Sequence, residues 1–132
     1  MIRPDTAATR LRVLIAEDEP ATASTTAALL RLDGHEVFVA RDGPSALEAV
    51  EAYDPEVLLL DIGLPGVYGC EVARRVRTRI APKTPLLVAV TGYVGDADRR
   101  RSAEAGIDLH LANPVEPELL QQLLKRFLNV VG

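Results

Sequence analysis

Short runs of apolar residues alternate with amphipathic stretches from Leu11 to the end of the chain. The apolar runs are rich in Val, Leu and Ile and have the length of strands. They predict strands at Leu11–Ala16, His35–Ala40, Pro55–Asp61, Pro85–Thr91 and Ile107–Ala112. The third and fourth runs are apolar almost throughout, which is typical of strands that are buried on both faces of a sheet.

The stretches between these runs have the spacing of helices. The first carries Ala23, Ala27 and Leu30 on one face and ends at Asp33-Gly34. The other predicted helices are Gly43–Tyr53, about Cys70–Arg79, about Asp96–Ala105 (ended by Gly106) and Pro117–Val130. Strands that alternate with helices predict right-handed crossovers and a parallel sheet covered on both faces. We therefore expect an α/β fold with a doubly wound sheet of five parallel strands and five helices.

Length, charge and cysteine content narrow the range of functions. The 132 residues fit one domain, residues 11–132, preceded by a flexible tail of residues 1–10. A formal net charge of −4 gives no reason to expect nucleic acid as a direct partner. There is no signal-peptide pattern, no apolar run of membrane-spanning length, and only one cysteine, Cys70. These features predict a cytoplasmic protein without a membrane partner.

Polar residues follow the predicted strands at the edge where open α/β sheets bind ligands. They are Glu17, Asp18, Glu19, Arg41, Asp42, Asp61, Thr91 and Asn113. In the flavodoxin-like strand order 2-1-3-4-5 the first and third strands are neighbours, so Asp18 and Asp61 converge. A cluster of oxygen ligands suits a hard divalent cation, Mg²⁺ first. Glu19 taken alone has a simpler explanation as a helix cap, and Thr91 taken alone as an ordinary hydroxyl at a strand end.

Four segments in this order resemble the receiver domain of two-component response regulators, of the kind found in chemotaxis regulators, over about Arg12–Val130. They are VLIAEDEP, VLLLDIGLPGVYGCEVARRVR, LLVAVTG and LHLANPVEPELL. The resemblance implies a signal-transduction domain of a phosphorelay. Such a domain takes a phosphoryl group onto Asp61 from a histidine kinase or a histidine phosphotransfer protein.

The resemblance also implies roles for the neighbouring residues. Asp18 and Asp61 would coordinate Mg²⁺ (or Mn²⁺) together with the backbone carbonyl of Gly63. Glu17 would act on the cation mainly through water. Thr91 would donate its hydroxyl to a phosphoryl oxygen and so couple the modification to the loop that carries it.

Two positions depart from the family pattern. Asn113 precedes Pro114 where the family has a lysine, whose ammonium pairs with the phosphoryl oxygens. An amide still donates hydrogen bonds but has no charge, so we expect phosphorylation to continue with altered switching. His110 stands where the family often has Tyr or Phe, and it would act with Thr91 as the switch. The rival hypothesis is a pseudo-receiver that binds partner proteins without being phosphorylated.

Other classes of protein fit less well. A flavin-binding flavodoxin needs a hydroxyl- and glycine-rich phosphate loop after the first strand, where this chain has AEDEP. A metal-dependent phosphatase with an aspartate nucleophile usually needs a cap or further acidic residues. We therefore expect no enzymatic activity beyond Mg²⁺-dependent self-phosphorylation and slow self-dephosphorylation. The run DADRRR is most simply a solvated face; its functional alternative is a charged surface for a homodimer or a partner on the fourth helix, fifth strand and fifth helix.

Overall fold

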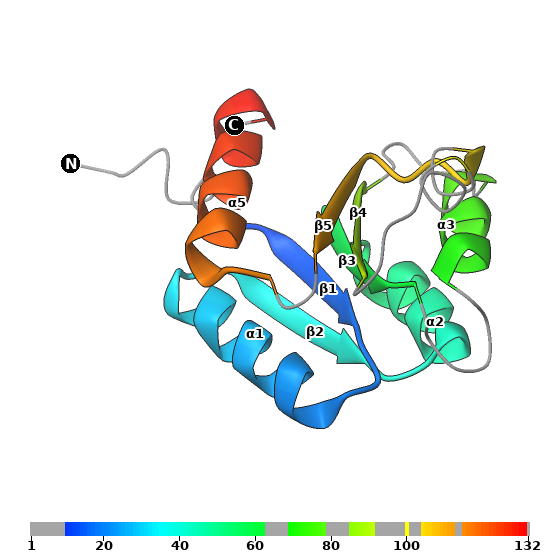
Figure 1. The fold of residues 1–132 in the computed structure, drawn as a ribbon, viewed down its shortest axis with the longest axis horizontal. Coiled ribbons are helices and arrows are strands. Elements are labelled where there is room, and N and C mark those ends of the chain that lie inside the picture. The colour runs from blue at the N-terminus through cyan, green and yellow to red at the C-terminus, as the bar shows by residue number, and fades with distance from the viewer. Residues whose placement is uncertain are drawn as a thin grey trace.

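The computed structural model describes residues 10–62, 69–78, 85–91, 100, 104–112 and 115–131. One parallel sheet of five strands, in the order β2-β1-β3-β4-β5, forms its centre (Figure 1). The strands are β1 (Arg12–Ala16), β2 (Glu36–Ala40), β3 (Val57–Asp61), β4 (Leu86–Thr91) and β5 (Leu109–Ala112). The predicted flavodoxin-like α/β sheet is confirmed.

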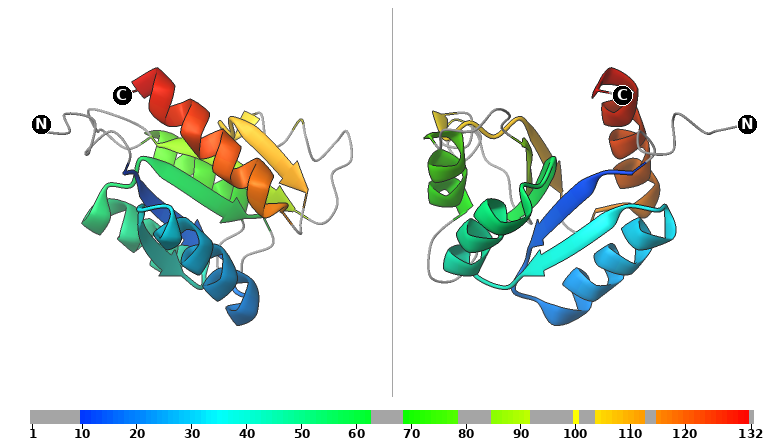
Figure 2. Two further views of the ribbon diagram at one scale, coloured as in Figure 1. Left: turned by 90° about the vertical axis from the view of Figure 1, so that its left-hand side faces the viewer. Right: turned by 180° about the vertical axis from the view of Figure 1, so that it is seen from behind.

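Helices cover both faces of the sheet. They are α1 (Pro20–Leu32), α2 (Gly43–Tyr53), α3 (Gly69–Thr78) and α5 (Pro117–Val131). The pair α1 and α5 lies on one face, and α2 and α3 lie on the other (Figure 2). The described part of the chain thus has four helices rather than the five expected, and most of the range predicted as a fifth, 96–105, lies outside the described residues. Within the described ranges, no helix combines the length and apolarity needed to cross a membrane.

The two faces of β1 explain why the predicted strand is an uninterrupted apolar run. Val13 and Ile15 pack beneath α1 and α5, whereas Leu14 and Ala16 pack beneath α2 and α3. All four side chains are at most 4% exposed, because alternate residues of a strand point to opposite faces and helices cover both. The same alternation buries Val57, Leu58, Leu59 and Leu60 of β3. Two hydrophobic layers therefore hold the ends of β1 and β3 in place.

Helix caps fix how the chain leaves the sheet. Glu19 is the N-cap of α1, and its carboxylate accepts a hydrogen bond from the backbone N–H of Ala21 at 2.9 Å. Asp42 caps α2 in the same way by accepting from the N–H of Ser45 at 2.7 Å. At the other end of α1, Gly34 has a φ of +92°, a conformation that glycine adopts without strain. These caps explain why the turns after β1 and β2 are short.

Candidate functional site

Three carboxylates converge where β1 and β3 end. Glu17 and Asp18 follow the last residue of β1, and Asp61 is the last residue of β3. The two strands are paired in register, with Ala16 opposite Leu60, so the residues that follow are neighbours. One carboxylate oxygen from each of Glu17, Asp18 and Asp61 can be chosen so that all three lie within 4.8 Å of one another. The predicted convergence of Asp18 and Asp61 is present, and Glu17 joins it.

Glu17 is the most buried of the three, with 7% of its surface exposed. Its carboxylate accepts a hydrogen bond from the backbone N–H of Glu19 at 3.0 Å, and its own N–H donates to the carbonyl of Ala40 at 2.9 Å. Burial raises the pKa of Glu17 from 4.5 to about 7; the negative charge of Asp61 and hydrogen bonds with Asp61 and Asp18 add to the rise. The Glu19 N–H bond opposes it. Sequence reasoning did not anticipate this burial, although the apolar residue before Glu17 was a signal for it.

Asp18 and Glu19 differ in what their side chains do. Asp18 is exposed, and its backbone carbonyl accepts a hydrogen bond from the guanidinium of Arg41 at 3.2 Å. That contact ties the turn after β1 to the turn after β2. Glu19 caps α1, as the simpler of its two explanations predicted. The run of three acidic residues therefore supplies two carboxylates to the cluster and one to the helix.

Gly69 is a site residue that sequence reasoning missed. It begins α3, and its N–H donates to the carbonyl of Ile62 at 3.0 Å. A Cβ at this position would lie 2.6 Å from the Cα of Ile62 and 2.8 Å from the carbonyl oxygen of Asp61. Both atoms belong to the backbone, which cannot turn aside as a flexible side chain would. Glycine is therefore required here for α3 to pack against the end of β3 that carries Asp61.

The structure describes only some of the remaining predicted site residues. The backbone of Thr91 ends β4, one position beyond Val90, which pairs with Asp61. His110 lies half-buried in β5, paired with Ala89 of β4. Gly63 and Asn113 lie outside the described residues.

Cys70 is half-buried beside the hydrophobic layer under α2 and α3. This is the packing role expected for a lone cysteine that follows a helix start. No other His, Cys, Asp or Glu cluster of three with ligand-like spacing occurs in the part of the chain that the structure describes.

Comparison with known proteins agrees with this arrangement. The sequence model of the response regulator receiver domain matches residues 13–125. The gliding motility regulatory protein of Myxococcus xanthus is 33% identical over 130 residues, which are 96% of this chain and 17% of that protein. The sensory transduction protein RegX3 of Mycolicibacterium smegmatis is 38% identical over 102 residues, 77% of this chain and 43% of that protein. The chain thus spans less than half the length of either relative.

Solved structures have the same fold. The receiver domain of the sensor histidine kinase PA1611 from Pseudomonas aeruginosa, with a magnesium ion coordinated in its active site cleft, superposes with a TM-score of 0.81. It is 28% identical, and the match covers 90% of this chain and 98% of that one. The family match runs from β1 into α5 and includes all three clustered carboxylates. The chain therefore belongs to the response regulator receiver domain family.

Proposed function

We propose that this receiver domain takes a phosphoryl group onto Asp61 from the phosphohistidine of a histidine kinase or a histidine phosphotransfer protein. The observation that carries the proposal is the convergence of Glu17, Asp18 and Asp61 at the carboxyl ends of two neighbouring strands. Three acidic groups within 4.8 Å of one another are costly to a protein that has no use for them. In a phosphoacceptor site the same three groups would bind the cation and supply the nucleophile.

The residues present fit a Mg²⁺ (or Mn²⁺) ion. Asp18 and Asp61 offer carboxylate oxygens, which are hard donors, and Glu17 stands close enough to orient bound water. The backbone carbonyl of Gly63 completes the proposed set. The magnesium ion in the PA1611 receiver domain supports this assignment by similarity. When bound, such an ion neutralises the negative charge that gathers as a carboxylate approaches a phosphoryl group.

Asp61 would act as the nucleophile. An oxygen of its carboxylate forms a bond to phosphorus while the phosphorus–nitrogen bond of the donor phosphohistidine breaks. The electron pair of that bond stays on the imidazole nitrogen. The departing imidazole is neutral if its other ring nitrogen carries a proton; otherwise it takes a proton from solvent. The hydrophobic layers that fix the end of β3, and the close approach of Gly69, hold the Asp61 backbone in one place for this attack.

Signal output would depend on Thr91, His110 and Asn113. Thr91 would donate its hydroxyl to a phosphoryl oxygen, and His110 would respond as the second switch residue. Asn113 offers an amide where the family has an ammonium, so the interaction with the phosphoryl group is weaker by about 0.5–2 kcal/mol. We expect phosphorylation to be slower by about tenfold than with lysine, with weaker coupling to the output face.

The partners follow from the same proposal. The phosphoryl donor would be a kinase or phosphotransfer protein in the cytoplasm. A second copy of the chain would bind through the fourth helix, β5 and α5. The domain would have no catalytic activity beyond its own phosphorylation and slow dephosphorylation, and no direct contact with nucleic acid.

The test is intact-protein mass spectrometry after incubation with Mg²⁺ and acetyl phosphate. We expect a mass gain of one phosphoryl group in the wild type, none in Asp61→Asn, and a faster gain in Asn113→Lys. Glu48→Gln on the exposed side of α2 is the matched control for loss of an acidic charge, and it should gain mass like the wild type. No gain in the wild type, with folding intact, would overturn the proposal in favour of a pseudo-receiver.

A further inference from the structure

A cavity of about 300 Å³ lies beside the acidic cluster, on the face of the sheet that α1 and α5 cover. Its apolar floor includes Ile15 of β1 and Leu59 of β3, and Leu120 contributes from α5. The first half of α1 forms one wall of the cavity, through three threonines: Thr22, Thr25 and Thr26. The receiver mechanism described above uses only the acidic end of this space, at Glu17 and Asp61.

The cavity exists because of the sequence of α1. From Ala21 to Ala28 the helix has no side chain larger than threonine. Thr22 and Thr26 are one helical turn apart, on the same side of α1, and both are half-buried. Leucines on that side would extend over the sheet and fill the space. The small residues leave space above the apolar floor, between α1 and α5.

The cavity and the acidic cluster share two residues. Glu17 and Asp61 line the cavity and also belong to the group of three carboxylates. The space is therefore apolar over its floor, bears hydroxyls on one wall and is negatively charged at one end. A ligand that matches all three parts has an apolar body and a positively charged group that donates hydrogen bonds. A protonated amine has this chemistry, since an ammonium has three donors and no acceptor.

We propose that this cavity binds a small organic amine in its protonated form, with the ammonium at Glu17 and Asp61 and the apolar body over Ile15 and Leu59. A bound amine would occupy the carboxylates that the divalent cation needs, so the two would compete. The competition rests on the proposed metal site, whereas the binding itself requires neither a metal nor phosphorylation. The domain would then be inhibited directly by an amine ligand.

Binding is tested by NMR titration of the full chain in metal-free buffer with three probes. Phenethylamine has both the charge and the apolar body, phenethyl alcohol has only the body, and methylammonium has only the charge. We expect phenethylamine to bind at least about tenfold more tightly than either of the other two, with the largest amide shifts at Thr22, Thr25 and Thr26. Equal binding of phenethylamine and either partial probe, or shifts elsewhere only, would overturn the proposal.

Two variants of α1 locate the binding. Thr26→Leu fills the cavity, and we expect it to weaken phenethylamine at least about tenfold. Ser24→Leu is the matched control, because Ser24 lies on the same helix, is exposed and does not line the cavity. It should bind phenethylamine like the wild type. Thr26→Val, which keeps the shape and removes the hydroxyl, covers the case in which the larger side chain prevents folding, and it should bind more weakly than the wild type.

Competition separates this inference from the proposed function. Saturating Mg²⁺ should weaken phenethylamine about tenfold in the wild type, and phenethylamine should slow phosphorylation by acetyl phosphate. Unchanged phenethylamine affinity at saturating Mg²⁺ would overturn the competition. Failure of Asp61 to accept a phosphoryl group would overturn the proposed function alone, since the metal-free titration does not depend on it.

Discussion

The two ends of the β-sheet treat charge in opposite ways. At the carboxyl end, Glu17, Asp18 and Asp61 place like charges together, and the pKa of Glu17 rises to about 7 mainly because the group is buried. At the amino end, the side chains of His35, Glu56 and Asp108 each face a complementary group of the chain itself. His35, which precedes β2, is buried, and its Nδ1 accepts a hydrogen bond from the N–H of Leu11 at 3.1 Å.

Acidic residues at the amino end have the same complementary surroundings. Glu56 accepts from the N–H of Arg12 at 2.9 Å and lies 3.8 Å from its guanidinium. Asp108 accepts from the N–H of Leu87 at 2.8 Å and pairs with Arg77 at 2.5 Å. These groups at the amino end therefore stabilise the fold, whereas the three carboxylates at the carboxyl end lie beside one another and repel. Removing an acid should destabilise one end and stabilise the other.

The largest effect is expected from Asp108→Ala. It leaves the backbone N–H of Leu87 and the guanidinium of Arg77 without the acceptor they share. We expect the free energy of unfolding to fall by about 2–3 kcal/mol, measured by urea denaturation, mainly because the N–H of Leu87 is buried. Arg77 also donates to the carbonyl of Gly106 at 2.8 Å, and this bond remains in the variant. A loss below about 0.5 kcal/mol would show that the amino end does not depend on this pairing.

At the carboxyl end, Glu17→Gln should stabilise the protein in metal-free buffer. The folded pKa of Glu17, about 7, lies above its value of 4.5 when free, so the folded state binds the proton more tightly. The wild type therefore loses stability as the pH rises from 4.5 through 7. We expect the free energy of unfolding of Glu17→Gln to exceed that of the wild type by about 2 kcal/mol at pH 8 and to differ little from it at pH 4.

The matched control for this change is Glu48→Gln, at an exposed position of α2, which should change stability by less than about 0.5 kcal/mol. Urea denaturation at both pH values measures the two variants side by side. A destabilised Glu17→Gln at pH 8 would contradict the contrast between the two ends. Equal gains in both variants would mean that net charge, rather than the cluster, is responsible.

The fold was predictable where local signals and packing agree. The limits of α2, Gly43–Tyr53, agree with the predicted helix to the residue; Pro44 stands at its start, and the structure adds Asp42 as its N-cap. The third strand was predicted from Pro55, but β3 begins at Val57, where pairing with β1 starts; Pro55 has no backbone N–H to donate to a neighbouring strand. Apolar runs and caps thus place the elements and leave their ends uncertain by a residue or two.

The site was predictable only in part. The position of Asp61 after four buried residues identified it, and strand order brought Asp18 to it. The need for Gly69 arises from the backbone of Ile62, and the cavity from side chains that α1 lacks, so neither has a local pattern. Contacts between segments that are distant in the chain, and empty space, become visible only in three dimensions.

His35 gives a smaller effect with the opposite dependence on pH. Burial lowers its pKa below 6.5, and protonation of Nδ1 would remove the acceptor of the Leu11 N–H. The unfolded chain therefore binds the proton more tightly, and stability falls as the pH drops below about 6.5. We expect His35→Ala to cost about 1 kcal/mol at pH 8 and less at pH 5, as measured by urea denaturation. A constant cost at both pH values would assign the loss to packing alone.

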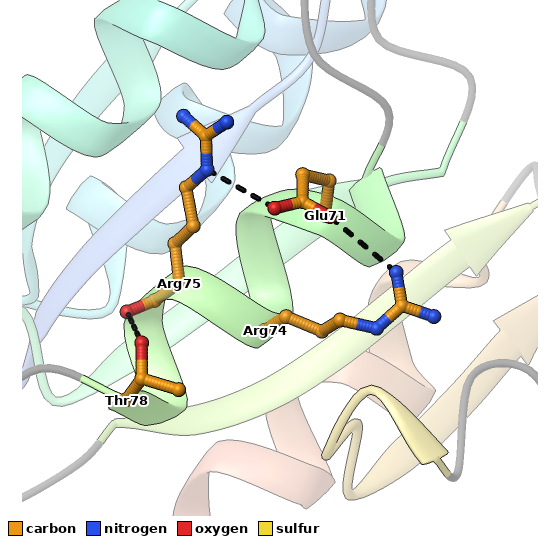
Figure 3. Close-up of polar contacts among 4 residues, drawn as sticks. All are labelled: Glu71, Arg74, Arg75 and Thr78. Atoms are coloured by element: carbon orange, nitrogen blue, oxygen red, sulfur yellow. Dashed lines mark hydrogen bonds and ion pairs between the residues drawn. The ribbon is translucent and has the colours of Figure 1, made fainter.

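The smallest effect is expected from Glu71→Ala on the outer side of α3. Glu71 faces Arg74 at 3.4 Å and Arg75 at 3.1 Å (Figure 3), so it has as many arginine contacts as any acid at the amino end. These side chains are between 43% and 55% exposed, and neither contact involves a buried backbone group. Solvent therefore replaces the lost bonds, and the free energy of unfolding should fall by no more than about 0.5 kcal/mol. Comparison with Asp108→Ala shows whether stability depends on how many ion pairs an acid makes or on its bond to a buried backbone N–H. Similar losses in both variants would mean that the hydrogen bond from the Leu87 N–H contributes nothing.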